Sequence, residues 1–182
     1  MSASESVYAV GEELARQLNQ PELVHVLVLA EGLSINGSPL VQGMEAALPA
    51  HVRVSGGLAG DDKDFEETVL CTSRGVFNHH VAALGFYGKA LHVGCGSCGG
   101  WDPFGVERVI TRSVDNEVFE MDGQPALALY GKYLGSFASG LPATGLLFPL
   151  EPEGLHEEAV RFVVEGFGGL PASDERGVSW PR

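Results

Sequence analysis

The sequence predicts an α/β (α+β) fold with mixed, largely antiparallel sheets and helices packed on their outer faces. The first sixty residues alternate helix-like and strand-like segments, which is the rhythm of an α/β layer. After residue 60 the strand-like segments flank short turns, as in antiparallel hairpins. A hydrophobic fraction of 45% over 182 residues is enough to bury a core, so an ordered protein is expected.

The early part of the chain predicts helix, strand, helix and strand in that order. Apolar residues at helical spacing predict a helix over 4–19. The continuous apolar run VHVLVLA predicts a strand over 24–30 that is covered on both faces. A second helix is expected over 39–48 with Ser38 as its cap, and HVRVS predicts a short strand over 51–55.

The later part predicts two hairpins and two further helices. Arg74-Gly75 supplies the turn of the first hairpin, and Val114-Asp115-Asn116 supplies the turn of the second. The expected strands are 67–73, 76–88, 90–96, 106–113, 117–123 and 146–150, and the expected helices are 124–137 and 155–167.

Charge and composition exclude several classes of partner. The chain has 11 basic and 24 acidic residues, and its net charge of −13 would repel nucleic acid and anionic membrane surfaces. No apolar run approaches the ~18 residues that a membrane span requires. The first basic residue is Arg16, which does not fit a secretory signal, and three cysteines do not suggest a disulfide scaffold. The cytoplasm is the expected compartment.

The segment GGLAGDD, residues 56–62, is the densest candidate for ligand binding. It follows the predicted second strand, and α/β folds bind ligands at the carboxyl ends of strands. Glycines let backbone amides approach a ligand, and paired aspartates accept hydrogen bonds or hold a cation. The alternative is a tight turn whose aspartates cap the next segment. The candidate residues here are Gly56, Gly57, Gly60, Asp61 and Asp62.

Two further side chains lie in loops where ligands are commonly held. Trp101 is flanked by glycines, so it could form the wall of a pocket, or else a plug over the end of the sheet. Asn36 lies in the loop after the first buried strand. Both are included among the candidate ligand-binding residues.

Cys95 and Cys98 have the spacing of a thiol–disulfide centre, but the Gly-Gly-Trp-Asp-Pro that follows cannot begin the activating helix. A zinc site would combine this pair with His92, and with His79 or His80. Consecutive histidines on a strand point to opposite faces, so at most one of the latter two could join. Unliganded, reduced cysteines are the third alternative.

No catalytic motif is present. The sequence lacks a G-x-S-x-G elbow and an H-E-x-x-H helix. From the residues alone we therefore expect an α/β ligand-binding domain.

Together the motifs resemble the FIST family, named for F-box and intracellular signal transduction proteins. The resemblance covers residues 24–150 and rests on EGLSINGSPLVQGMEAALP, VSGGLAGDDKDFEET, LGFYGKALHVGCGSCGGWDPFGVERVITRSVDNEVFEMDGQPALALYGKYLG and GLPATGLLFPL. It implies a non-enzymatic sensory domain without a cofactor that binds a small ligand, with amino acids among the candidates. For the alternative metal site at Cys95 and Cys98, the resemblance adds haem iron to zinc. It also adds Asp102, beside Trp101, to the expected pocket residues.

The resemblance also implies partners and a domain organisation. The expected partners are the small ligand and a signalling protein such as a histidine kinase or a cyclase, and a homodimer remains open. Residues 1–138 correspond to part of an N-terminal-type FIST domain. Residues 139–182 correspond to a short start of a C-terminal-type domain with an atypical tail, so we expect a truncated copy.

Overall fold

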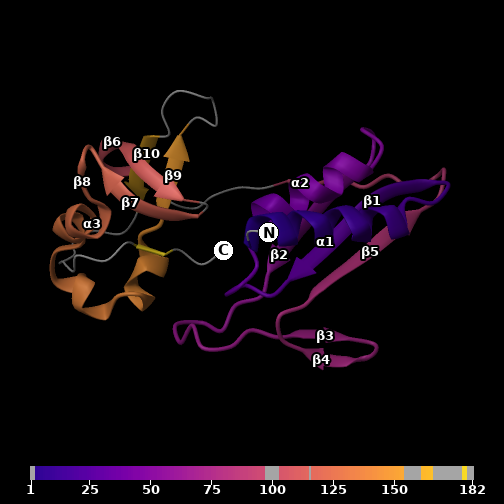
Figure 1. Cartoon of the computed structure of the whole chain (residues 1–182), viewed down its shortest axis with the longest axis horizontal. Helices are drawn as coiled ribbons and strands as arrows, with labels where there is room; N and C mark the ends of the chain where they lie inside the picture. Colours follow the sequence, from indigo (N-terminus) through magenta and orange to yellow (C-terminus); the bar gives the residue numbers. More distant parts are fainter. Residues whose placement is uncertain (1–2, 97–102, 115, 154–160, 166–177, 180–182) are drawn as a thin grey trace. The chain divides into compact units, whose positions relative to one another are not determined.

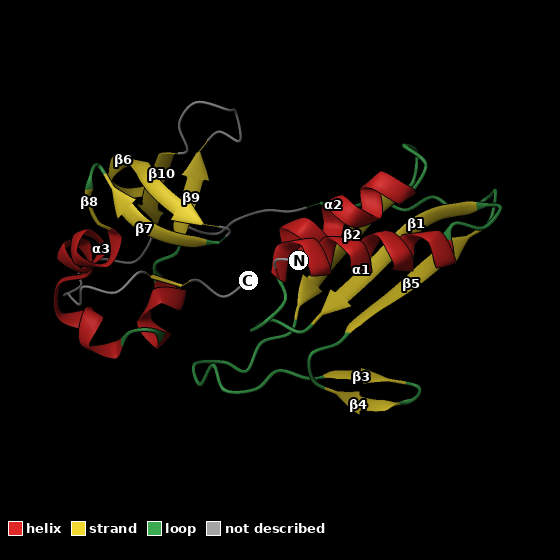
Figure 2. Ribbon diagram, in the orientation of Figure 1, coloured by secondary structure: helices red, strands yellow, loops and turns green. Residues whose placement is uncertain are grey.

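The computed structural model describes residues 3–96, 103–114, 116–153, 161–165 and 178–179, and it forms two compact units. The first unit contains the described residues up to 96, and the second contains those from 103 onward. Both units combine helices with strands (Figure 2). This mixture of helices with parallel and antiparallel strands confirms the predicted fold class.

A three-stranded sheet with two helices on one face forms the body of the first unit (Figure 1). The strand order is β2 (Arg53–Leu58), β1 (Leu23–Ala30) and β5 (Val81–Tyr87). β2 runs parallel to β1, and β5 runs antiparallel to it. The covering helices are α1 (Ala3–Leu18) and α2 (Gly37–Ala47), which lie side by side.

The core of this unit lies between β1 and the two helices. Alternate residues of a strand face the same side of a sheet, and Val26, Val28 and Ala30 are all buried on the helix side. They pack with Leu40 and Met44 of α2. The remaining buried members of this cluster are Ala15, Leu23, Ile35 and Val52.

The prediction of Ser38 as the cap of the second helix was wrong. α2 begins earlier, and its N-cap is Asn36, whose side-chain oxygen accepts a hydrogen bond from the backbone N–H of Ser38 at 3.1 Å. Asparagine is as good a cap as serine. Pro39 lies in the first turn of α2, where a proline loses no intrahelical hydrogen bond.

The predicted long strand 76–88 is two strands with different partners. β3 (Leu70–Thr72) and β4 (Gly75–Phe77) form the expected hairpin, while β5 leaves it and pairs with β1. The break is at residues 78–80, which form no strand, and His79 there has a positive φ of 49°. The predicted strand 90–96 was wrong, since these residues form no strand.

The second unit is built on a sheet in the order β11-β7-β6-β10-β9. The expected hairpin of the later sequence is confirmed by the antiparallel pairing of β6 and β7. The strands are β6 (Pro103–Val114), β7 (Glu117–Met121), β8 (Gln124–Pro125), β9 (Leu150–Glu153), β10 (Arg161–Glu165) and β11 (Val178–Ser179), and β8 pairs with β7.

Two predictions for the end of the chain were wrong where the structure describes it. In place of the predicted strand 146–150, the strand β9 begins only at Leu150, and the 3₁₀ helix η2 (Ala143–Leu147) lies before it. Part of the predicted helix 155–167 is the strand β10, which pairs with β6 and β9. The run Phe-Val-Val in β10 favours a strand, because β-branched and aromatic side chains suit a sheet.

The helix α3 (Ala126–Leu134) covers β7 and is followed by the 3₁₀ helix η1 (Gly135–Gly140). Tyr130 and Leu134 are fully buried in the core beneath it. The other buried members of this core are Val118, Met121, Ala126, Leu129, Ala138 and Phe148. No helix among the described residues is long and apolar enough to cross a membrane.

Replacing Tyr130 with phenylalanine should destabilise the second unit by about 1–3 kcal/mol. The Tyr130 hydroxyl donates a hydrogen bond of 2.8 Å to the carbonyl of Phe148, and burial raises the pKa of this tyrosine. The variant would leave that carbonyl buried without its donor. Urea unfolding followed by circular dichroism measures the change, with Tyr8→Phe at an exposed position of α1 as a comparison. An unchanged midpoint for Tyr130→Phe would contradict the hydrogen bond.

Candidate functional site

A pocket of about 320 Å³ lies between the edge strand β2 and the start of α2. It is close to the carboxyl ends of β1 and β2, which is where the sequence placed a ligand. Its volume is at the lower end of the range for ligand pockets, roughly 300–1,000 Å³. The lining residues are Val28, Ala30, Gly37, Leu40, Val41, Val54, Ser55, Gly56, Gly57 and Leu58.

Gly56 and Gly57 line this pocket, but they belong to a strand and not to a loop. Gly56 pairs with Val28, and a β-carbon added at Gly56 would lie 1.8 Å from the carbonyl oxygen of Val28. Glycine is therefore required there by the close approach of β2 to β1. A β-carbon at Gly57 would meet no atom within 4 Å. The backbone of Gly57 is therefore open to a ligand, as expected, although this residue lies in a strand and not in a loop.

Asn36 lies at the same end of α2 as the pocket. Its side chain caps the helix, which fixes the position of Gly37 in the pocket wall. A β-carbon added at Gly37 would lie 3.9 Å from a methyl carbon of Leu58, so the start of α2 faces the end of β2. Asn36 thus supports the pocket through the helix that it caps.

Gly60, Asp61 and Asp62 follow β2 but are not among the residues that line the pocket. One side-chain oxygen of Asp61 accepts hydrogen bonds from the backbone N–H groups of Glu66 at 2.6 Å and Glu67 at 3.0 Å. This is the alternative in which an aspartate caps the next segment. Gly60 and Asp62 are exposed.

The remaining predicted site residues belong to the tryptophan loop and to the alternative metal site. Trp101, Asp102 and Cys98 lie outside the described residues. His92 and Cys95 are exposed, in a stretch without helix or strand. In the described part of the chain, no three His, Cys, Asp or Glu side chains are grouped so that they could hold a metal.

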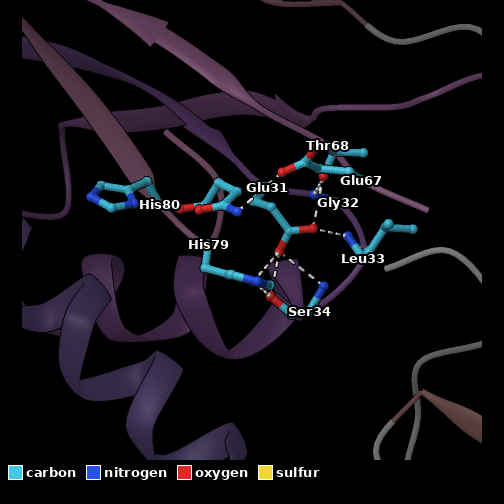
Figure 3. A network of polar contacts seen from close by, with 9 residues as sticks. Glu31, Gly32, Leu33, Ser34, Glu67, Thr68, His79 and His80 are labelled. Atoms are coloured by element: carbon cyan, nitrogen blue, oxygen red, sulfur yellow. Dashed lines mark hydrogen bonds and ion pairs between the residues drawn. The ribbon is translucent and has the colours of Figure 1, made fainter. Parts of the chain in front are cut away.

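A buried carboxylate, Glu31, lies directly after β1 and was missed by the sequence analysis (Figure 3). Glu31 is 1% exposed. Its two oxygens accept hydrogen bonds from the backbone N–H of Leu33 at 2.6 Å, from the N–H of Ser34 at 2.9 Å and from the hydroxyl of Thr68 at 2.7 Å. The Ser34 hydroxyl donates a fourth hydrogen bond. The only sequence signal was an acidic residue at the end of an apolar strand.

Thr68 and His79 extend this network to two other segments. The Thr68 hydroxyl oxygen accepts a hydrogen bond from the N–H of Gly32 at 3.0 Å. The Nδ1 atom of His79 lies 3.0 Å from the Ser34 hydroxyl oxygen and 3.8 Å from a Glu31 oxygen. His80 has a different neighbour, the carbonyl of Asn78 at 2.5 Å. Both histidines lie between β4 and β5, outside any strand, so the prediction that they are strand residues was wrong.

Burial and hydrogen bonding act in opposite directions on Glu31. Burial raises its pKa, while hydrogen bonds from the side chains of Ser34 and Thr68 and from the backbone of Leu33 and Ser34 lower it. The hydrogen bonds together outweigh burial and lower the pKa from 4.5 to about 2. The ionised carboxylate therefore acts as a structural anchor. It holds the turn 31–34 that leads from β1 toward the helix beside the pocket.

A second pocket, of about 480 Å³, lies at the opposite end of the sheet. It surrounds the beginning of β1, and its lining includes Glu22, His51 and Lys89. Lys89 and Glu22 form an exposed ion pair of 3.3 Å there. None of the predicted site residues lines this pocket, and the amino ends of strands are not where α/β folds usually bind ligands. The pocket beside β2 is therefore the better candidate.

Comparison with known proteins gives one family match. A family model described as the FIST N domain matches residues 1–124, which spans all of the first unit and β6 and β7 of the second. Neither the curated proteins nor the solved structures contain a match.

Proposed function

Because the chain belongs to the FIST N domain family, we propose that it is a non-enzymatic sensory domain that binds a small ligand in the pocket beside β2. This membership agrees with the resemblance seen in the sequence motifs. The family consists of sensory signal-transduction domains and is not a known enzyme family, so a general signalling role follows from it. The ligand, its site and the direct partners are the parts that we add.

The observation that carries the proposal is the pocket itself. Its wall contains Gly56 and Gly57, which are candidate ligand-binding residues from the sequence. It also contains Gly37, which directly follows the candidate Asn36. Most of its wall is apolar, and the polar groups are few, which is the usual composition of a small-molecule site. Amino acids and other small metabolites of the cytoplasm are the first compounds to test.

A signal from this pocket would pass through the elements that form its wall. A ligand there contacts both β2 and α2, and α2 packs closely on α1. Binding would therefore favour one arrangement of the helix pair over others. A histidine kinase or a cyclase is the proposed receiver, with a homodimer as the proposed assembly.

We also propose that the N-terminal-type FIST domain ends at residue 138, which lies within η1, and that a short C-terminal-type domain begins after it.

A pocket-filling variant tests the proposal. Val41 is half-buried and lines the pocket, while its neighbour Gln42 is exposed and does not. We expect a thermal-shift screen to find a metabolite that stabilises the wild-type chain by about 2.7 kcal/mol at a hundredfold excess over its Kd. The same compound should stabilise Gln42→Trp equally and Val41→Trp far less.

Two results would contradict the proposal. One is a folded wild-type protein that none of the screened compounds stabilises. The other is a compound that stabilises Val41→Trp as much as the wild type, because its site would then lie elsewhere. Circular dichroism of both variants establishes that each is folded before the ligands are compared.

A further inference from the structure

We propose that the ligand of this pocket is a neutral, extended peptide segment. One apolar side chain enters the pocket, and the adjoining amide groups pair with the free edge of β2. This inference rests on the proposed function for the location of the site, and it adds the chemical class of the ligand.

The charge of the pocket wall argues against a free amino acid. None of the ten lining residues has a charged side chain. Ser55 is the one polar side chain among them, and its hydroxyl oxygen already lies 2.8 Å from Nε2 of the buried His25. A free amino acid would bring an ammonium and a carboxylate into this wall without a charged partner, which is unfavourable. A peptide segment carries neither group.

The acidic segment after β2 also disfavours a ligand that carries a carboxylate. Residues 61–67 contain five acidic side chains and one lysine, and they begin three residues beyond Leu58 of the pocket wall. A ligand carboxylate at the carboxyl end of β2 would be repelled by these charges. An uncharged amide would not be.

The edge of β2 supplies the complementary polar groups. β2 is at the end of the strand order in the described sheet, and five consecutive residues of it, Val54–Leu58, line the pocket. The N–H of Ala59 donates to the carbonyl of Ala30 in β1 at 2.8 Å. Because the residues of a strand alternate between its two edges, Gly56 and Leu58 direct their backbone groups away from β1.

Within the part of the chain that the structure describes, β2 carries little of the usual protection against an added strand in its own sequence. Edge strands are commonly blocked by proline, by lysine or by inward-pointing charges. The sequence of β2 is RVSGGL, in which only Arg53 is charged and two glycines leave the backbone uncovered. Extended peptides add to such edges, with alternate side chains entering pockets. The pocket walls of Leu40, Val41 and Leu58 suit a branched aliphatic side chain.

Calorimetry with three probes on the full chain tests the ligand class. The probes are acetyl-alanyl-leucyl-alanyl-amide, the same peptide with methylated leucine and following alanine nitrogens, and free leucine. We expect the first probe to bind the wild type and Gln42→Trp. The methylated peptide should bind about tenfold more weakly, because a neutral hydrogen bond is lost. Free leucine should bind the wild type more weakly than the first probe does, by a similar factor or more. The first probe should bind Val41→Trp more weakly than the wild type, again by a similar factor or more.

The outcomes separate this inference from the proposed function. The peptide class is overturned if the methylated peptide binds as tightly as the first probe, or if free leucine binds more tightly than it. In either case the proposed site still stands if Val41→Trp abolishes binding. Failure of the capped peptide to bind, with another compound bound at this pocket, also overturns the inference alone. If no compound binds at the pocket, the inference and the proposed function both fail.

Discussion

Replacing Gly43 with alanine is expected to destabilise the first unit by about 3 kcal/mol. A β-carbon added at this position of α2 would lie 2.1 Å from the carbonyl oxygen of Tyr8 in α1 and 2.9 Å from its carbonyl carbon. Gly11 has the reciprocal position, with its added β-carbon 2.1 Å from the carbonyl oxygen of Leu40. Both obstacles are backbone atoms, so the two helices, which lie side by side in Figure 1, would have to separate.

The sign of this effect distinguishes helix packing from helix propensity. Propensity alone predicts that a glycine-to-alanine change within a helix stabilises it by about 1 kcal/mol. The structure predicts the opposite sign at Gly43. Gly37→Ala on the same helix is the matched control, because its nearest neighbour would be a Leu58 methyl carbon at 3.9 Å. Urea unfolding measures both changes, and a neutral or stabilising Gly43→Ala would contradict the close crossing.

The glycines also show what could not be predicted from the sequence. Apolar spacing predicted the first helix and an expected cap predicted the second, and their bounds differ from the prediction by one or two residues. Glycine is required at positions 11 and 43 because the two helices touch there, and no local sequence pattern reveals that contact. Gly56 was interpreted as a loop glycine for the same reason, since its constraint comes from Val28 of the neighbouring strand.

Pairing between distant segments accounts for the other differences. The residues of β5 form a good strand pattern next to β4, but the strand pairs with β1, which lies more than fifty residues earlier. The candidate site was predicted in part, because Gly56 and Gly57 line the pocket. Glu31 was missed because Thr68, one of its two hydroxyl donors, is 37 residues away in the sequence and closes the network that buries it.

Replacing Glu31 with glutamine is expected to destabilise the first unit by about 3 kcal/mol near neutral pH. The carboxylate accepts four hydrogen bonds from protein donors. Glutamine has one oxygen in place of two, and its amide nitrogen would face N–H and O–H groups that are themselves donors. The turn 31–34 would lose its anchor to Thr68, and the buried donors would lose their acceptor.

The pH dependence of stability identifies this carboxylate. The pKa of Glu31 is about 2 in the folded protein and has an ordinary value of 4.5, so the folded state holds this proton less tightly than the unfolded state. The corresponding stability is fully present above pH 4.5 and is lost as the pH falls toward 2. Linkage gives this contribution a size of about 3 kcal/mol. The Glu31→Gln variant should lack it, so its curve should be flatter than that of the wild type over this window.

A second exchange tests whether the loss comes from the network and not from a changed charge alone. Glu45 is an exposed glutamate on α2, and Glu45→Gln should change the unfolding free energy by less than about 0.5 kcal/mol. Thr68→Val removes the hydroxyl that donates to Glu31. Because the two groups share one hydrogen bond, the double variant should be less destabilised than the sum of the single variants. Additive effects, or a Glu31→Gln curve that keeps the wild-type slope between pH 4.5 and 2, would show that Glu31 is not the anchor of this turn.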